Sequence, residues 1–504
     1  MGRFRVYALV AAAYLGTFLS TLDLSIVNVA LPTLQKVFHS ELGGLQWVIN
    51  VYAICLSSLM LSAGSLSDKY GHKRIWVLSI ILFILGSIVC SFANQLNILL
   101  WGRAIQGIAG SFLIPGAMPI LTHAFPDKKR SSKIIGGWSA FSALALISGP
   151  LLGGWLIENY GWESIFMINV PFGTLTIILS IWSISERKYP EHAALDPAGQ
   201  IASILFLGML SYSLIEISEY SLLSANVLIP LFFSIFSLLV FIYIEARIKR
   251  PLFPISLFKS NRELIFLNIA SFTLGFSGYA SLFFMSLFLQ QVQTDSPSLT
   301  GWHLMPQFVI TVLISLLFGR FVKLIPLRNL LIIGYFLVGF SLSFMIYFKP
   351  DTPYFTIGIT LAILGIGMGL SVPGTATMVM LSVPLERAGI ASATMNALRQ
   401  IGMSIGIAIL GSIMSINAIK KMVENIHKME KSQAYNIAYN AIIKHFIPLE
   451  KNGLHNTYRV AMSSGFGLAM LCAGITSLLA AFILLFISRR KKIKNTHSIS
   501  NHSE

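Results

Sequence analysis

Long apolar runs constrain this chain more than any other feature of its sequence. Each is close to the roughly 20 residues that an α-helix needs to cross a bilayer. Charged residues make up only 11% of the chain, whereas soluble domains carry about 25%. We therefore expect an all-α polytopic membrane protein with fourteen transmembrane helices, whose runs lie at 6–31, 45–66, 75–93, 97–121, 134–158, 164–184, 199–219, 226–246, 263–290, 301–322, 329–348, 354–380, 391–417 and 460–487.

The basic residues indicate which side of the membrane each connecting segment faces. Lys and Arg are enriched in short cytoplasmic loops. Most of them fall in segments that would share a side with the N-terminus, among them 69–74, 128–133, 247–262 and 489–494. We therefore expect a protein of the cell (inner or plasma) membrane with both termini cytoplasmic. Its net charge of +16 then reflects this membrane face and its lipid, and not nucleic acid binding.

Two similarities within the chain indicate a parallel duplication. In the first, Gly64 and Lys73 align with Gly319 and Arg328. In the second, Gly107-Ile108 and Pro115-Gly116 align with Gly365-Ile366 and Pro373-Gly374. Parallel repeats related by an axis along the membrane normal are a transporter architecture. We expect four parts: an N-terminal six-helix bundle over 1–184, a linker with two extra helices over 185–262, a C-terminal six-helix bundle over 263–488 and a basic cytoplasmic tail over 489–504. The outer loop 418–459 would be a solvated cap or a helical hairpin on the outer surface.

Motifs for enzyme chemistry are missing from the sequence. It has no G-x-x-x-x-G-K-[ST] phosphate loop, no H-E-x-x-H motif and no G-x-S-x-G elbow. Its three cysteines, Cys55, Cys90 and Cys472, lie in apolar runs without disulfide or metal spacing. We expect no enzyme activity, no cofactor and no metal. Energy for transport would come from an ion gradient or from the substrate's own gradient.

Two charges of opposite sign, Asp23 and Arg103, lie at similar depth inside apolar runs. A charge at the centre of a spanning helix costs roughly 2.5–3.5 kcal/mol on insertion scales and marks a functional site by default. At 1.5 Å per residue, Asp23 lies about 12 Å and Arg103 about 9 Å below the outer surface. We expect them to face one cavity and to interact; the alternative is that each meets backbone and water separately. Burial favours the protonated form of Asp23 and Arg103 favours the ionised form, so this acid could take up and release protons.

Two glycine-containing segments have a composition typical of segments that move during a conformational change. Gly64, Asp68, Gly71, Lys73 and Arg74 lie between the second and third runs, where glycines permit a tight turn. We interpret this loop as a gating latch on the cytoplasmic side.

The second segment lies in the fifth run and contains Gly149, Pro150, Gly153 and Gly154. Proline removes a helix hydrogen bond and kinks the helix, and glycine lets another helix approach closely. We expect a hinge or a tight contact near the outer gate. Further polar residues expected at the cavity are Asn28, Asn50, Gln106, Asn396 and Arg399.

Together these motifs resemble the major facilitator superfamily. GSLSDKYGHKR at 64–74 is similar to its signature between spans 2 and 3, RAIQG at 103–107 to its R-x-x-Q-G motif, and SGPLLGG at 148–154 to its antiporter motif of span 5. LDLSIVNVALP at 22–32, NALRQIG at 396–402 and the number of spans resemble the drug:proton antiporter branch with fourteen spans, the group of EmrB-like and QacA-like multidrug exporters.

The resemblance implies roles for several residues. Asp23 would take part in protonation and cation recognition, and Arg103 in proton transfer. Pro150 and its glycines would bias the protein toward export, and Asp68 would be the acid of the cytoplasmic latch. Some multidrug members carry a further carboxylate in late spans, but 391–417 contains no Asp or Glu. Neutral or monocationic substrates are therefore favoured over dications.

The sequence thus predicts a proton-coupled antiporter that exports amphipathic drugs or toxic compounds by alternating access. Its partners would be small amphipathic molecules, protons and membrane lipid, with a membrane-fusion protein if the cell is Gram-negative. A dedicated exporter of one metabolite, such as a siderophore or lipid-like product, is the alternative. A receptor or scaffold without transport is the third reading, and the charges within the spans argue against it.

Overall fold

The chain folds into helices that match a membrane protein. The computed structural model describes residues 3–125, 128–188, 196–217, 220, 223–248, 261–383, 388–426, 430–444 and 454–499. Every regular element among these residues is a helix, which confirms the predicted fold class. Thirteen of the described helical segments are long and apolar enough to cross a membrane. They cover every predicted run except 134–158, which lies within a long helix, so the count of fourteen stays a prediction.

The N-terminal half is a bundle in which helices distant in sequence pack in pairs. Its elements are α1 (Arg3–Phe38), α2 (Leu42–Tyr70), α3 (His72–Ser91), α4 (Leu96–Ala124), α5 (Lys128–Tyr160), α6 (Ser164–Met167) and α7 (Asn169–Ser183). α1 packs on α5 and α7, while α4 packs on α2 and α3. α1 and α4 therefore each pack against several other helices of this half.

The C-terminal half repeats these pairings. Its elements are α11 (Arg262–Leu274), the π-helix η2 (Gly275–Tyr279), α12 (Ser281–Leu287), the π-helix η3 (Phe288–Val292), α13 (Pro297–His303), α14 (Met305–Leu324), α15 (Leu327–Phe344), η4 (Met345–Tyr347), α16 (Tyr354–Leu381), α17 (Ala388–Asn425), α18 (Lys431–Ile442) and α19 (Leu454–Ile499). α11 and η2 pack on α17, and α16 packs on α14 and α15. The same scheme in both halves is what a parallel duplication requires, although the domain boundaries stay predictions.

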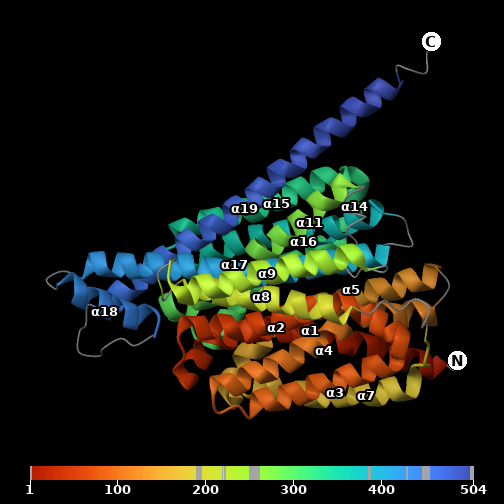
Figure 1. The fold of residues 1–504 in the computed structure, drawn as a ribbon, viewed down its shortest axis with the longest axis horizontal. Coiled ribbons are helices and arrows are strands. Elements are labelled where there is room, and N and C mark those ends of the chain that lie inside the picture. Colours follow the sequence, from red (N-terminus) through yellow and green to blue (C-terminus); the bar gives the residue numbers. More distant parts are fainter. Residues whose placement is uncertain are drawn as a thin grey trace.

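Two further helices connect the halves. They are α8 (Pro197–Glu216) and α9 (Ala225–Arg247). α8 contacts both α2 and α17, and α9 packs on α8 (Figure 1). Large apolar side chains of α9 such as Phe232 and Leu239 are more than half exposed, as expected for a helix facing lipid.

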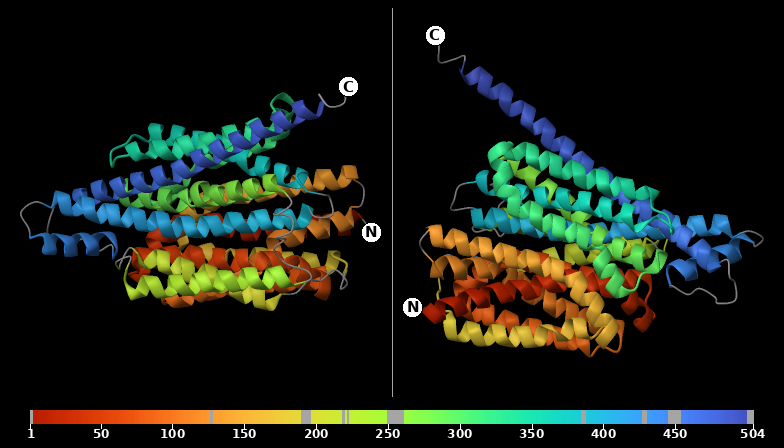
Figure 2. Two further views of the ribbon diagram at one scale, coloured as in Figure 1. Left: turned by 45° about the horizontal axis from the view of Figure 1, so that its top comes forward. Right: turned by 180° about the vertical axis from the view of Figure 1, so that it is seen from behind.

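The molecule has two distinct ends, which we name by their contents. The start of α1 and the end of α19 lie at one end, here called the terminal end, and α18 lies at the other, here called the α18 end (Figures 1 and 2). The described part of 418–459 is largely helical, because α17 runs on to Asn425 and α18 follows. The backbone N–H of Leu42 donates to the carbonyl of Ile443, at 3.0 Å, which ties this segment to the start of α2.

The segment 64–74 is not the loop that the sequence predicts. α2 continues through Gly64 and Asp68 to Tyr70 and α3 begins at His72, so Gly71 alone makes the turn. No proline interrupts 64–70, and a continuing helix satisfies the backbone hydrogen bonds of these residues within the chain. Gly71 has a φ of 112°, a conformation that residues with a Cβ rarely adopt.

A carboxylate that the sequence did not single out braces this turn. Glu186, which follows α7, accepts hydrogen bonds from the backbone N–H groups of Lys73, at 3.0 Å, and Arg74, at 3.1 Å. These donors in the first turn of α3 have no partner within the helix, and negative charge is favourable there. Asp68 lies 3.0 Å from the ring of His72. The predicted gate motif is therefore a compact joint between α2, α3 and the end of α7.

Replacing Gly71 by alanine is expected to destabilise the protein by about 1–3 kcal/mol. A left-handed conformation costs a residue with a Cβ roughly 1–2 kcal/mol, and this Cβ would also collide with the carboxylate of Glu186. Gly64→Ala is the matched control, because a Cβ at Gly64 would meet nothing within 4 Å and alanine favours a helix over glycine. Thermal unfolding of both variants in detergent checks this, and equal Tm values for the two would contradict strain at Gly71.

Candidate functional site

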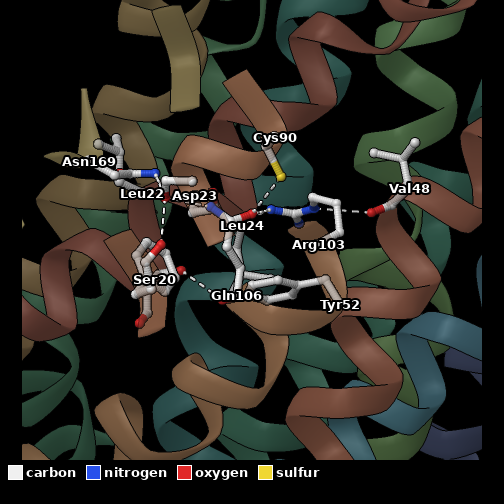
Figure 3. Close-up of polar contacts among 12 residues, drawn as sticks. Ser20, Leu22, Asp23, Leu24, Val48, Tyr52, Cys90, Arg103, Gln106 and Asn169 are labelled. Atoms are coloured by element: carbon white, nitrogen blue, oxygen red, sulfur yellow. Dashed lines mark hydrogen bonds and ion pairs between the residues drawn. The ribbon is translucent and has the colours of Figure 1, made fainter. Parts of the chain in front are cut away.

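A buried ion pair joins α1 to α4 inside the N-terminal half (Figure 3). The Arg103 guanidinium donates from Nη1 to Oδ2 of Asp23, and the two side chains are 1% and 0% exposed. Removing two charges from water is unfavourable unless further hydrogen bonds satisfy their remaining donors and acceptors. The surroundings of this pair therefore decide whether it can persist.

Gln106 and two groups of α2 provide further partners for the pair. Gln106 accepts from Arg103 Nη1 at 2.8 Å and donates to Asp23 Oδ1 at 3.1 Å. The three-residue spacing between Arg103 and Gln106 places both on one face of α4. Arg103 Nε donates to the carbonyl of Val48 at 3.1 Å, and the guanidinium carbon lies 4.3 Å from the ring centre of Tyr52. The R-x-x-Q spacing thus builds a closed polar network around Asp23.

A second layer of polar groups was missed in the sequence. Ser87 accepts from Gln106 Nε2 at 2.9 Å and from Asn169 Nδ2 at 3.2 Å. The Cys90 thiol lies 3.6 Å from Gln106 Oε1. Polar residues within otherwise apolar runs were the available signal for Ser87 and Asn169. No sequence signal pointed to the Val48 carbonyl or the Tyr52 ring, because their positions depend on how α2 packs on α4.

The predicted shared cavity is not observed at the ion pair in this conformation. Helices α1 to α4 enclose Asp23 and Arg103, together with Phe166 of α6 and Asn169 of α7. All of these elements belong to the N-terminal half. Because each charge compensates the other, the pair does not need water to remain buried. Its functional role stays a prediction.

The other predicted cavity residues lie in separate places. The amide of Asn28 donates to the Leu24 carbonyl at 2.9 Å. Asn50 is 0% exposed, and neither polar atom of its side chain has a hydrogen-bond partner in the described part of the chain. Asn396 and Arg399 are adjacent on α17, where Arg399 Nη2 donates to Asn396 Oδ1 at 2.6 Å, and both are partly exposed.

Hydrogen bonds join the two halves near the α18 end. Four side chains donate or accept across the junction: Ser286 to the Asn28 carbonyl at 2.7 Å, Gln290 to the Val29 carbonyl at 2.9 Å, Gln291 to Gln35 at 2.7 Å, and Gln46 to the Ile407 carbonyl at 3.3 Å. Among the residues described, we find no side-chain hydrogen bond between the halves at the terminal end. Among the described residues, the side-chain hydrogen bonds between the halves therefore lie toward the α18 end.

The predicted hinge motif forms a tight part of this junction. α5 is one continuous helix through Pro150, and α13 packs against it. A Cβ on Gly154 would lie 2.6 Å from Cα of Ser298, and a Cβ on Gly301 would collide with the carbonyl oxygen of Pro150. The backbone N–H of Ser298 also donates to Glu158 Oε1 at 3.1 Å. The structure shows a close contact at this motif, and its role as a hinge stays a prediction.

The remaining glycines of the motif serve the N-terminal half itself. A Cβ on Gly149 would collide with Ser25, and a Cβ on Gly153 would lie 2.8 Å from the side chain of Ile26. Both partners are on α1, two and three residues after Asp23. α5 thus uses one pair of glycines to approach the helix of the ion pair, and Gly154 to approach the opposite half.

Comparisons with known proteins agree with this architecture. A family model described as the Major Facilitator Superfamily matches residues 13–407. The chain is 32% identical over 416 residues to the multidrug resistance protein Stp of Mycobacterium tuberculosis (strain CDC 1551 / Oshkosh), covering 82% of this chain and 77% of Stp. It is 30% identical over 405 residues to the methylenomycin A resistance protein of Bacillus subtilis (strain 168), covering 80% of this chain and 86% of that protein.

A solved structure shares the fold at low sequence identity. A bacterial homologue of the human lysosomal transporter Spinster superposes with a TM-score of 0.63 at 17% identity, covering 96% of this chain and 98% of that one. The family match, the apolar helices and the two similar halves agree with one another. The chain therefore belongs to the Major Facilitator Superfamily and is a multi-pass membrane transporter of that family.

Proposed function

We propose that this protein is a proton-coupled antiporter that exports amphipathic drugs or toxic compounds across the cell membrane by alternating access. The observation that carries the proposal is the Asp23–Arg103 pair, a fully buried acid and base within spanning helices. Such residues are rare in membrane interiors and mark ion or proton pathways. An efflux role is supported by the relative named multidrug resistance protein Stp.

Protonation of Asp23 is the proposed coupling step. In the conformation described, the ionised carboxylate accepts hydrogen bonds from Arg103 and Gln106. A proton on Asp23 removes the charge that holds Arg103, whose guanidinium keeps its hydrogen bonds to Gln106 and to the Val48 carbonyl. The network therefore has two arrangements that differ by one proton. A proton gradient can bias such a two-state element only if the two conformations of the protein bind the proton with different affinities.

The junction suggests which conformation is present. We place both termini in the cytoplasm, because α2 returns toward the terminal end, where Lys69, Lys73 and Arg74 lie around the turn between α2 and α3. The halves are then joined at the outer end by α13 and by the side chains from α1 and η3. This arrangement corresponds to an inward-open state, which would load substrate from the cytoplasm and release it after the outer junction parts.

A dedicated exporter of one metabolite is the second candidate. The relative named methylenomycin A resistance protein, which carries the name of a single compound, supports this narrower role. We also propose membership of the branch with fourteen spans, and a membrane-fusion protein partner if the cell is Gram-negative. Substrate breadth separates the two candidates.

An efflux panel on cells that lack their own drug exporters tests the proposal. Cells expressing the protein should accumulate several amphipathic dyes less than control cells, and an uncoupler should raise their dye content to the control level. Protection against one compound only would favour the dedicated exporter. Efflux that persists unchanged with the uncoupler would contradict proton coupling.

A further inference from the structure

The charges inside the membrane do not cancel. Only Asp23, Arg103 and Arg399 lie more than one helical turn from either end of a predicted apolar run, and they sum to one positive charge. The other charged residues of the runs lie at their ends: Glu158, Glu216, Glu219, Glu245, Glu263 and Arg320. Since Asp23 is paired with Arg103, the unbalanced charge belongs to Arg399.

Arg399 has only neutral partners. Its Nη2 donates to Asn396 Oδ1 at 2.6 Å, and its guanidinium carbon lies 5.2 Å from the ring centre of Tyr279. Its Nε is buried and has no hydrogen-bond partner. Within the described ranges, no carboxylate lies within ion-pair distance of Arg399. A charged arginine without a counter-charge in a spanning helix is unfavourable unless a further group accepts its remaining hydrogen bonds or balances its charge.

Close packing fixes the position of this arginine. A Cβ on Gly275 would collide with the carbonyl oxygen of Arg399, so α17 approaches η2 backbone to backbone. η2 is a short π-helix, a form that is rare and frequent at functional sites, and it ends at Tyr279. α17 also contacts α2 of the opposite half. The arginine is therefore set on a rigid frame near the junction of the halves.

The group is accessible as well as rigid. Tyr279, Asn396 and Arg399 are all partly exposed, in contrast to Asp23 and Arg103. Arg399 lies eight residues after the start of its predicted run at 391, about 12 Å along the helix from the terminal end. That is the end at which the described residues provide no hydrogen bond between the halves. A molecule entering from the terminal end would meet Arg399 before the outer junction.

We propose that Arg399, Asn396 and Tyr279 form a subsite for the carboxylate of an amphipathic substrate. A carboxylate accepts paired hydrogen bonds from a guanidinium, which would include the free Nε, and these charge-assisted bonds are among the strongest in proteins. Asn396 holds the guanidinium in place, and the Tyr279 ring offers an apolar face beside it. The inference rests on the proposed export function and names a chemical group that its substrates would carry.

Two dyes with one skeleton test the subsite. Rhodamine 110 carries a free carboxylate that is ionised at pH 7, and rhodamine 123 is its methyl ester. Fluorescence anisotropy with the purified full-length protein gives the Kd of each. The wild type is expected to bind the carboxylate form about tenfold more tightly than the ester, and Arg399→Gln to bind both with a ratio near one. Arg399→Lys should keep part of the preference, because it retains the charge without the planar fork.

A further variant separates recognition from folding. Asn396→Ala removes the acceptor that orients Arg399 and should reduce the preference for the carboxylate form. Gel filtration of each variant establishes that it is folded. Equal binding of the two dyes by the wild type, or an unchanged preference in folded Arg399→Gln, would overturn the subsite while leaving the export function in place. A wild type that binds neither dye would also overturn the subsite, while the efflux panel described above decides the export function.

Discussion

Asp23→Asn is expected to abolish accumulation of substrate against its gradient while leaving the protein folded. Asparagine has nearly the shape of aspartate and offers one oxygen to Arg103 and Gln106, but it cannot take up a proton at this position. One proton moving through 100 mV provides about 2.3 kcal/mol, which corresponds to a concentration ratio of about fifty. Proteoliposomes with an imposed proton gradient should therefore show a steady-state accumulation lower by about that factor for each proton lost from the cycle.

Downhill exchange in the same vesicles separates coupling from binding. Asp23→Asn should still exchange labelled substrate against unlabelled substrate without a gradient, since the Arg399 region is untouched. Glu424→Gln is the matched control, because this carboxyl is 49% exposed and pairs only with Lys421, a contact worth little in water. Wild-type accumulation by Asp23→Asn would remove this acid from the coupling mechanism.

The partner residue should behave differently. Arg103→Ala leaves the Asp23 carboxylate buried without its counter-charge, and breaking a buried pair in this way costs about 3–5 kcal/mol. We expect a loss of folded protein from this variant. Adding Asp23→Asn to it should restore part of the yield, because the unpaired charge is then gone. Yield and gel-filtration profile after purification measure both effects.

Sequence reasoning was most successful where membrane thickness decides the answer. Apolar length located all the described spans, because no other environment accommodates such runs. It was less successful at helix ends, since hydropathy marks the bilayer and not the last hydrogen bond of a helix. α1 therefore continues to Phe38 and α17 to Asn425, beyond their apolar runs. For the same reason, the expected loop at 64–74 is mostly the end of α2.

The candidate site was predictable in part for a similar reason. Depth along α1 and α4 placed Asp23 and Arg103 at one level, and helical spacing placed Gln106 on the face of Arg103. The hydrogen bond from Arg103 to the Val48 carbonyl and those from α3 to Glu186 depend on tertiary packing. Tertiary packing leaves no periodic signal in the sequence. Contacts such as Ser286 to the Asn28 carbonyl depend in addition on the conformation, because they exist only while the halves are joined at that end.

Gly154→Val is expected to separate α5 from α13 and to lower transport at least about tenfold. Backbone atoms of Pro297 and Ser298 would lie within 2.6 Å of the new Cβ, and backbone cannot move aside as the tip of a long side chain can. The conformation joined at the α18 end would become less populated, so each cycle would less often return to loading. Hydrogen–deuterium exchange of the amides in 298–303 should become faster, because α13 loses its support.

Two matched variants decide whether this contact acts as a gate. Gly301→Val places the bulk on the opposite helix, against the Pro150 carbonyl, and should give the same faster exchange and the same loss of transport. Gly208→Val in α8 meets nothing within 4 Å of its Cβ and should change neither. If exchange in 298–303 stayed at the wild-type rate in both Gly154→Val and Gly301→Val, the close approach would be dispensable. Equal effects from the two sides would instead show that the distance between α5 and α13 controls the junction, because the two substitutions share that distance and nothing else.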